Sequence, residues 1–213
     1  MKGITFGEYH SYDDFKLLLL EGKEIGSPAV KENKIDVPGA DSALDLTDFF
    51  GEPKYEDVRH KFPFAAIVPH SEFPSLFSTI KNAIHGKKLR VILDDDPAFY
   101  YVGRIHVSGF TSEKNVGMVT VECDCEPYKY KLQPTIVMVT VNGSKTVTLT
   151  NSRKRAVPEV TSTAAMTLAF GSSTWTLGAG TFTLPELELV EGANAITLTG
   201  TGTVTFVWQE GAL

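Results

Sequence analysis

The sequence predicts a mainly β protein: an antiparallel β domain of the α+β kind with one covering helix, followed by a small antiparallel β-sandwich. Apolar residues alternate with threonine in the last third, one central stretch has helical spacing, and the other apolar stretches are short and separated by turn formers. Near Pro134 the composition changes, because residues 136–213 hold 16 of the 22 threonines while all five histidines precede Pro134. We therefore expect domains at residues 1–135 and 136–213.

The first domain is expected to hold one amphipathic helix over about residues 74–87. Its apolar side chains recur every three or four residues, Pro74 suits a first helical turn, and Gly86 suits a helix end. The apolar stretches around the helix are short enough to be strands of an antiparallel meander. These strands are expected at residues 17–20, 58–68, 89–93, 99–110 and 116–125.

The second domain alternates apolar residues and threonine with a period of two, which is typical of half-buried strands. Glycine and asparagine lie between these stretches and tolerate the positive φ angles of tight turns. Strands are therefore expected at residues 136–141, 146–150, 166–170, 181–184, 195–199 and 204–208. Turns are expected at residues 142–143, 178–180, 192–194 and 200–202.

Charge and hydropathy exclude several classes of protein. The chain has 20 Lys and Arg against 26 Asp and Glu, a net charge of −6, so it lacks the basic surplus that nucleic-acid binding requires. Apolar runs such as residues 17–20 and 65–68 are far shorter than the roughly 20 residues of a membrane-spanning helix. The first residues do not resemble a secretory signal, so synthesis in a cytoplasm is expected.

Cys123 and Cys125 are the two cysteines, and one residue separates them. In a strand this spacing points both side chains to one face without the geometry of an easy disulfide, so we expect two reduced core residues. A zinc site would need two more ligands from His10, His60, His70, His85 or His106. Because no second cysteine pair or close histidine pair is present, we predict no metal and no other cofactor.

Three consecutive aspartates, Asp94, Asp95 and Asp96, stand directly before a proline. They could bind a hard cation or form the centre of a hydrolase, but consecutive aspartates followed by Pro97 are typical of a hairpin turn. The sequence contains no Gly-x-Ser-x-Gly elbow or other local signature of an activated nucleophile. We therefore predict that the protein is not an enzyme.

The two tryptophans suggest an alternative function, carbohydrate binding during host attachment, because an indole face can stack on a sugar ring. Trp208 shares one face of its strand with Val204 and Phe206, which favours the core. Trp175, between two threonines, is the better candidate for an exposed sugar platform. The Arg153-Lys154-Arg155 cluster is either a solvated loop or a contact for an acidic neighbour.

Motifs along the first domain resemble those of the distal tail protein family of long, non-contractile-tailed phages, the siphophages. The resemblance covers residues 1 to about 135, in matching order and spacing. One of the motifs is Arg59 followed by Phe62-x-Phe64. The other motifs are Phe6-Gly7-x-x-His10-Ser11-x-x-Asp14-Phe15-x-Leu17, Val37-Pro38-Gly39-x-Asp41-x-x-Leu44-Asp45-Leu46-Thr47, and Cys123-Asp124-Cys125-Glu126-Pro127-Tyr128-Lys129-Tyr130.

This resemblance implies a structural protein of a virion or a prophage-encoded tail, located at the tail tip and assembled in the host cytoplasm. In the family, six copies form a ring through their first domains between the tail tube and the tip or baseplate, and a galectin-like sandwich follows. The implied partners are other copies, the tail tube protein, the tail-tip or hub protein and, as a further candidate, the tape measure protein. The implied ring-contact residues are Val37, Pro38, Gly39, Asp41, Leu44 and Asp45.

Two positions depart from the family pattern, because relatives often have glycine where this chain has Lys16 and Ser42. The first domain also has more aromatic residues than its periodic elements require. These are either interface anchors or core residues, and the sequence leaves both readings open. They are Phe49, Phe50, Tyr55, Phe73, Tyr128 and Tyr130.

Overall fold

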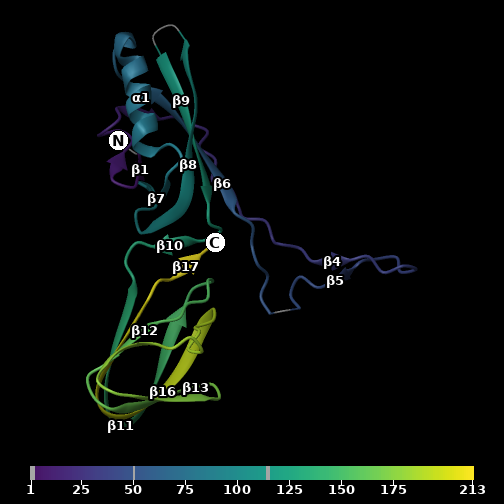
Figure 1. Cartoon of the computed structure of the whole chain (residues 1–213), viewed down its shortest axis with the longest axis vertical. Coiled ribbons are helices and arrows are strands. Elements are labelled where there is room, and N and C mark those ends of the chain that lie inside the picture. Colours follow the sequence, from purple (N-terminus) through teal and green to yellow (C-terminus); the bar gives the residue numbers. More distant parts are fainter. Residues whose placement is uncertain (1–2, 50, 114–115) are drawn as a thin grey trace. The chain divides into compact units, whose positions relative to one another are not determined.

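The fold comes from a computed structural model, which describes residues 3–49, 51–113 and 116–213. Contacts divide the chain into two compact units, Met1–Lys129 together with Leu213, and Tyr130–Ala212. Strands dominate both units, and the first unit also has one α-helix and one 3₁₀ turn (Figure 1). The predicted mainly β class is therefore confirmed. We refer to the two parts as the first and second units.

The first unit is built on an antiparallel sheet with the strand order β2-β1-β7-β8-β9-β6-β3. Its neighbouring strands are antiparallel throughout. The strands are β1 (Ile4–Phe6), β2 (Tyr9–His10), β3 (Leu17–Leu19), β6 (Val58–Ala66), β7 (Lys88–Leu93), β8 (Phe99–Glu113) and β9 (Val116–Cys125). Two further strands, β4 (Lys34–Ile35) and β5 (Leu44–Asp45), pair only with each other.

One face of this sheet is covered by helix α1 (Phe73–Ile84), which follows the 3₁₀ turn η1 (His70–Glu72). Phe73, Ile80 and Ile84 of the helix are at most 2% exposed and belong to the same core as the sheet. Residues 117, 119, 121, 123 and 125 of β9 point into that core, while the even-numbered ones are more exposed, as a period of two predicts. The bounds of β9 coincide with the predicted range.

The helix ends three residues earlier than predicted. His85 already has an extended backbone, with φ −63° and ψ 133°, and its Nδ1 accepts a hydrogen bond from the Val107 N–H at 3.0 Å. The Gly86 N–H donates to the Ile105 carbonyl at 2.7 Å, and Gly86 has a φ of 76°. These hydrogen bonds to β8 redirect the chain toward β7, so residues 85–87 leave the helix.

The second unit is built on an antiparallel sheet of six strands, and β10 (Lys129–Lys131) and β17 (Gly211–Ala212) pair with each other outside that sheet. β16 pairs along its whole length with β11, and on its other side with β13 and then β12. The strands are β11 (Thr135–Asn151), β12 (Glu159–Ser162), β13 (Met166–Phe170), β14 (Ser173–Leu177), β15 (Gly180–Thr183) and β16 (Gly192–Trp208).

Three of the turns predicted in this unit are wrong. Residues 142–143 lie within β11, and residues 192–194 and 200–202 lie within β16. Gly143 pairs with Gly200, so glycines face each other across the ladder where a turn was expected. A Cβ atom on Gly202 would lie 2.6 Å from Cε of Met166. Glycine therefore does not end the strand here, and Gly202 lets β16 pass close to Met166.

A single core fills the second unit. Side chains from β13 and from both halves of β16, including Leu168, Leu198 and Phe206, are fully buried in one cluster. Trp208 is 3% exposed, which confirms its predicted core position. The sequence reasoning missed β12 and β14, although the Ser173–Leu177 stretch has the same alternation of threonine and larger apolar residues as the strands that were predicted.

Candidate assembly interface

The sequence-predicted contact residues lie in an exposed ribbon, residues 30–49 and 51–57, that we call the arm. It starts where Val30 bridges Tyr55 and includes the isolated β4–β5 pair, which Figure 1 shows leading out from the start of β6. Every residue from 31 to 45 is exposed. Residues 31–45 therefore contribute no buried side chain to the first core.

The ribbon has two chemically different faces. Ile35 pairs directly with Leu44, and Lys34 pairs directly with Asp45, so the two pairs point to opposite sides. The sequence alternation places Val37 on the side of Ile35. These three apolar side chains are 49%, 52% and 44% exposed for Ile35, Leu44 and Val37. One face of the arm is consequently apolar and open.

The Val-Pro-Gly motif forms the turn at the end of this ribbon. The Ala40 N–H donates to the Val37 carbonyl at 3.1 Å, which closes a four-residue turn. Gly39 has a φ of 85°. Proline at the second position and a glycine with positive φ at the third are the signature of a type II turn. Pro38 and Gly39 therefore set the shape of the tip, and Asp41 follows it as an exposed carboxylate.

Asp45 holds the returning strand in place. Its Oδ1 accepts a hydrogen bond from the Thr47 N–H at 2.9 Å, and Oγ1 of Thr47 accepts one from the Asn33 N–H at 3.1 Å. The hydrogen bonds from Thr47 lower the pKa of Asp45 below its ordinary value. Asp45 thus shapes the arm, while Leu44 beside it supplies the apolar surface.

The aromatic candidates fall into two groups. Phe73 and Tyr130 are 2% and 8% exposed, so they are core residues and not anchors. Phe49, in the arm, is 71% exposed, and the ring centroids of Tyr55 and Tyr128 lie 5.9 Å apart in an edge-to-face pair. Phe50 lies outside the described residues. Phe49 is the aromatic side chain that fits an anchor best.

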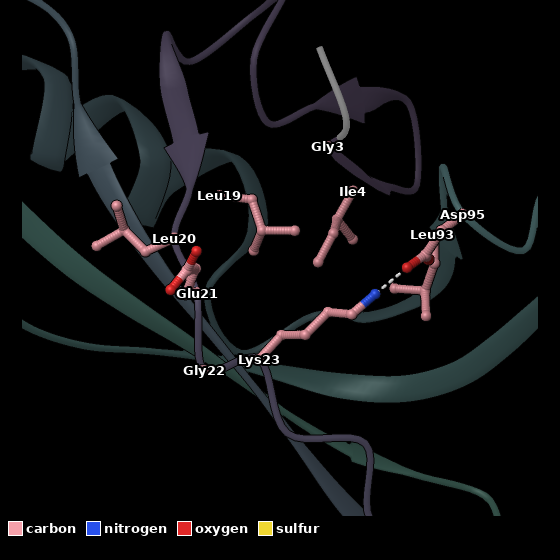
Figure 2. Close-up of a pocket in the computed structure, with 9 residues that line it drawn as sticks. All are labelled: Gly3, Ile4, Leu19, Leu20, Glu21, Gly22, Lys23, Leu93 and Asp95. Atoms are coloured by element: carbon pink, nitrogen blue, oxygen red, sulfur yellow. Dashed lines mark hydrogen bonds and ion pairs between the residues drawn. The ribbon is translucent and has the colours of Figure 1, made fainter.

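The three consecutive aspartates form a turn whose carboxylates diverge. Oδ2 of Asp94 accepts the Gly3 N–H at 2.7 Å, and Asp96 pairs with Lys129 at 2.8 Å. Figure 2 shows Asp95 forming an ion pair with Lys23 across a pocket of about 390 Å³. Because each carboxylate binds a different neighbouring group, the three aspartates attach the β7–β8 turn to the surrounding loops. This agrees with the turn predicted from the sequence.

Cys123 and Cys125 are free and fully buried, as predicted. A hydrogen bond with Cys125 and burial together raise the pKa of the Cys123 thiol far above its ordinary value. His60, also buried, pairs with Cys123 across β6 and β9, and its Nδ1 accepts the Gly26 N–H at 3.1 Å. Within the described ranges, no group of three or more histidine, cysteine, aspartate or glutamate side chains is placed to hold a metal ion.

The candidates in the second unit have partners within that unit. Trp175 packs partly buried against the second core, so only part of its indole is exposed. Arg153 and Arg155 form ion pairs with Glu191 and Glu188 at 2.6 and 2.8 Å, and Lys154 donates to the Tyr130 hydroxyl at 2.6 Å. The basic cluster is therefore largely neutralised by its own unit.

Comparison with solved structures shows a likeness that extends over the whole chain. The chain has the fold of the SPP1 Dit protein. The match to the crystal structure of SPP1 Dit (gp 19.1), described as a paradigm of the hub adsorption apparatus in phages that infect Gram-positive bacteria, has a TM-score of 0.71. It covers 100% of both chains at 16% sequence identity. No protein-family model and no curated protein matches the sequence.

On this Dit-like fold, sequence reasoning missed Ile35, the direct partner of Leu44. The alternation Lys34-Ile35-Asp36-Val37 contains the signal, but the strand itself spans only Lys34–Ile35, which is shorter than the about four to eight residues of an ordinary predicted strand. No helix in the described part of the chain has the length and apolar character needed to span a bilayer.

Proposed function

We propose that the protein is a distal tail protein of a siphophage or prophage, a structural component and not an enzyme. The observation that carries this proposal is the full-length likeness of fold to a phage hub protein, with a TM-score of 0.71. The motifs of the first unit support it independently, because they resemble the same family at the level of sequence. Six copies would form a ring that joins the tail tube to the tail tip, within the virion.

The arm supports a role in self-association. An isolated two-stranded ribbon is at best marginally stable in water, and this one leaves Ile35, Val37 and Leu44 about half-exposed on one face. A partner that covers this face would stabilise the ribbon and remove apolar surface from water. The ring-contact residues implied by the family motif lie in this arm: Val37, Pro38, Gly39, Asp41, Leu44 and Asp45.

The candidate catalytic groups support a structural role. The aspartates at 94–96 accept hydrogen bonds and ion pairs from separate neighbours, and the two thiols are fully buried. A catalytic constellation needs groups that converge on one accessible point. The other partners that we propose are the tail tube protein, the tail-tip or hub protein and the tape measure protein.

Mass measurement and imaging test the ring. Six copies of a 23.3 kDa chain give a particle of about 140 kDa, which light scattering after size-exclusion chromatography would detect. Negative-stain images should show rings with six-fold symmetry, and gold-labelled antibodies should bind the end of the tail distal to the head in phage particles that carry this protein. Single chains at every concentration, or label on the capsid, would contradict the proposal.

A further inference from the structure

We propose that two copies of the chain pair through the free edge of strand β11, antiparallel and about a two-fold axis at Val137. The contact uses residues 135–139, the first part of β11 in the second unit. It does not depend on the proposed ring, because the arm belongs to the first unit. It gives the chain a second surface that binds another copy.

β11 is a long edge strand. Among the residues that the structure describes, it pairs along its length with β16 and with no other strand. Its 17 residues are about three times the length of an ordinary strand. The edge of a sheet presents backbone N–H and C=O groups that have no partner, and such a row of groups is a template for a further strand.

The backbone groups of Ile136 and Met138 point outward from this edge. In β16, the Thr203 N–H donates to Oγ1 of Thr163 at 2.9 Å, and the Thr203 carbonyl accepts the Thr163 N–H at 3.0 Å. Thr163 directly follows β12, which lies on the side of β16 opposite to β11, so Thr203 turns away from Thr140, its partner in β11. The N–H and C=O of Thr140 therefore face the free edge, and by alternation those of Met138 and Ile136 do too.

Neighbouring groups limit the open part of the edge to residues 135–139. Pro134 has no backbone N–H, so hydrogen bonding across the edge cannot continue in full before the strand. At the other end, Nζ of Lys145 donates to the Thr140 carbonyl at 3.3 Å. A lysine at an edge strand is a common protection against pairing. Val137 is the middle residue of the part that remains open.

This open part is complementary to itself. In an antiparallel pair centred on Val137, Ile136 of one copy lies opposite Met138 of the other, and the two-fold axis repeats that pair. Because both residues have outward backbone groups, the two members of each pair exchange both of their hydrogen bonds. The Thr140 carbonyl, which already accepts a hydrogen bond, then lies opposite Pro134, which has no N–H to donate.

The side chains at the edge favour an apolar and uncharged partner strand. Ile136 and Met138 are 61% and 70% exposed, more than every other described large apolar side chain except Phe49. From Leu132 to Ser144 no residue is charged. Packing these side chains against each other would remove apolar surface from water. A second copy of the same strand supplies the backbone groups, the apolar side chains and the lack of charge.

Other free edges of the chain match this one less well. β2, β3, β4, β5 and β15 span only two to four residues each. β14 is longer, but its exposed side chains are those of Thr174 and Thr176, which offer hydroxyl groups in place of large apolar surface. The partner that fits β11 in length and in side chains is therefore β11 of a second copy.

The charge of the second unit permits two copies to approach each other. Tyr130–Ala212 contains five basic and five acidic residues, a net charge of zero, whereas the whole chain has a net charge of −6. Two second units therefore meet without the like-charge repulsion that two first units would bring.

Cysteine crosslinking locates the axis, because the two natural thiols are buried and do not compete. An equimolar mixture of Ile136→Cys and Met138→Cys chains should give more covalent pairs on a non-reducing gel than either variant alone, since each cysteine lies opposite the other position. Thr148→Cys, exposed farther along β11, is the control and should give few pairs. A single variant that crosslinks better alone overturns the axis at Val137, and no more pairs than the control overturns the contact.

Charged side chains at the same two positions test the register. Ile136→Lys with Met138→Lys places lysine opposite lysine across the axis, whereas Ile136→Lys with Met138→Glu places lysine opposite glutamate. The first chain should have a dissociation constant of the pair about tenfold or more above that of the second, measured by sedimentation equilibrium. Both positions are exposed, so circular dichroism should show the same fold for both chains. Equal dissociation constants overturn the register.

An arm variant separates this contact from the ring. Ile35→Thr with Leu44→Thr should weaken the ring but leave pairs of about 47 kDa, twice the 23.3 kDa of one chain, which light scattering detects at high concentration. If the wild type forms rings and this variant forms single chains only, the edge contact is wrong and the ring stands. If the wild type forms pairs without rings, the ring is wrong and the edge contact stands. Single chains throughout overturn both.

Discussion

Ile35 in β4 and Leu44 in β5 face each other directly across the arm, and each remains about half-exposed. They form a cross-strand apolar pair, and no described residue of the first unit covers it. In most sheets such a pair would lie over a core. Here the exposed pair makes the arm a surface for a partner. Replacing both side chains should therefore weaken assembly without much change in the stability of the single chain.

We expect Ile35→Thr combined with Leu44→Thr to change the free energy of unfolding of the single chain by no more than about 1 kcal/mol, because both side chains are already largely in water. Assembly should weaken clearly, since the ring contact loses its apolar face. Urea unfolding at low concentration and light scattering at high concentration measure the two effects. A large loss of stability with unchanged assembly would show that the pair serves the arm alone.

Among the residues that the structure describes, Lys16 is the non-glycine residue whose φ angle is positive, at 53°. Glycine adopts this conformation without the steric cost that a Cβ imposes, so Lys16→Gly should stabilise the chain by about 0.5–1 kcal/mol. Lys16→Ala is the matched control: like glycine it loses the hydrogen bond from Nζ to the Asp13 carbonyl, but it keeps the Cβ. Chemical denaturation should rank glycine above alanine, and the reverse order would contradict the conformational argument.

Gly202 allows β16 to pass close to Met166. Because an added Cβ would lie 2.6 Å from Met166 and φ is 153°, Gly202→Ala should destabilise the second unit by about 1–3 kcal/mol. Gly178→Ala is the control, since a Cβ there has no described atom within 4 Å. Thermal unfolding followed by circular dichroism measures both. Equal stability of the two variants would show that β16 can shift to relieve the contact.

Glu210 makes the second unit sensitive to acid. Burial alone would raise its pKa, but hydrogen bonds from Lys131, Ser152 and Thr135 outweigh burial and lower the pKa below its ordinary value. A carboxyl whose pKa is lowered by folding contributes stability above its unfolded pKa and loses it as the pH falls through its folded pKa. The wild type should therefore lose this contribution as the pH falls below the ordinary glutamate pKa of about 4.3 and through the lower pKa of the folded protein.

Replacing this carboxylate tests the pH effect. Glu210→Gln should cost about 1–3 kcal/mol at pH 7, and much less at an acid pH below the folded pKa of Glu210, where the wild-type carboxyl is itself protonated. Glu159→Gln, at an exposed position of the same unit, should have little effect at either pH. Urea unfolding at the two pH values provides the comparison. A cost that stays constant with pH would assign the effect to packing and not to charge.

The sequence alone determined the elements whose signal is local. Period-two alternation located β13 to the residue, since every second side chain of a half-buried strand must be apolar wherever the strand lies, and a short apolar stretch located β9 equally well. The spacing of apolar residues likewise located α1, apart from its last turn. The Val-Pro-Gly motif pointed to this loop through the resemblance to the distal tail protein family, and its proline and glycine suit the type II turn that the structure has there.

Tertiary structure decided what local signals leave open. In the sequence, Gly143, Gly200 and Gly202 are compatible either with a turn or with a strand that passes close to another chain segment. The pairing of β11 with β16 and the position of Met166 make them strand residues. The end of α1 depends on hydrogen bonds from β8, which lies many residues later in the chain. Whether Ile35 and Leu44 become core or surface depends on what covers them, and burial is a property of the assembled fold that the order of residues does not state.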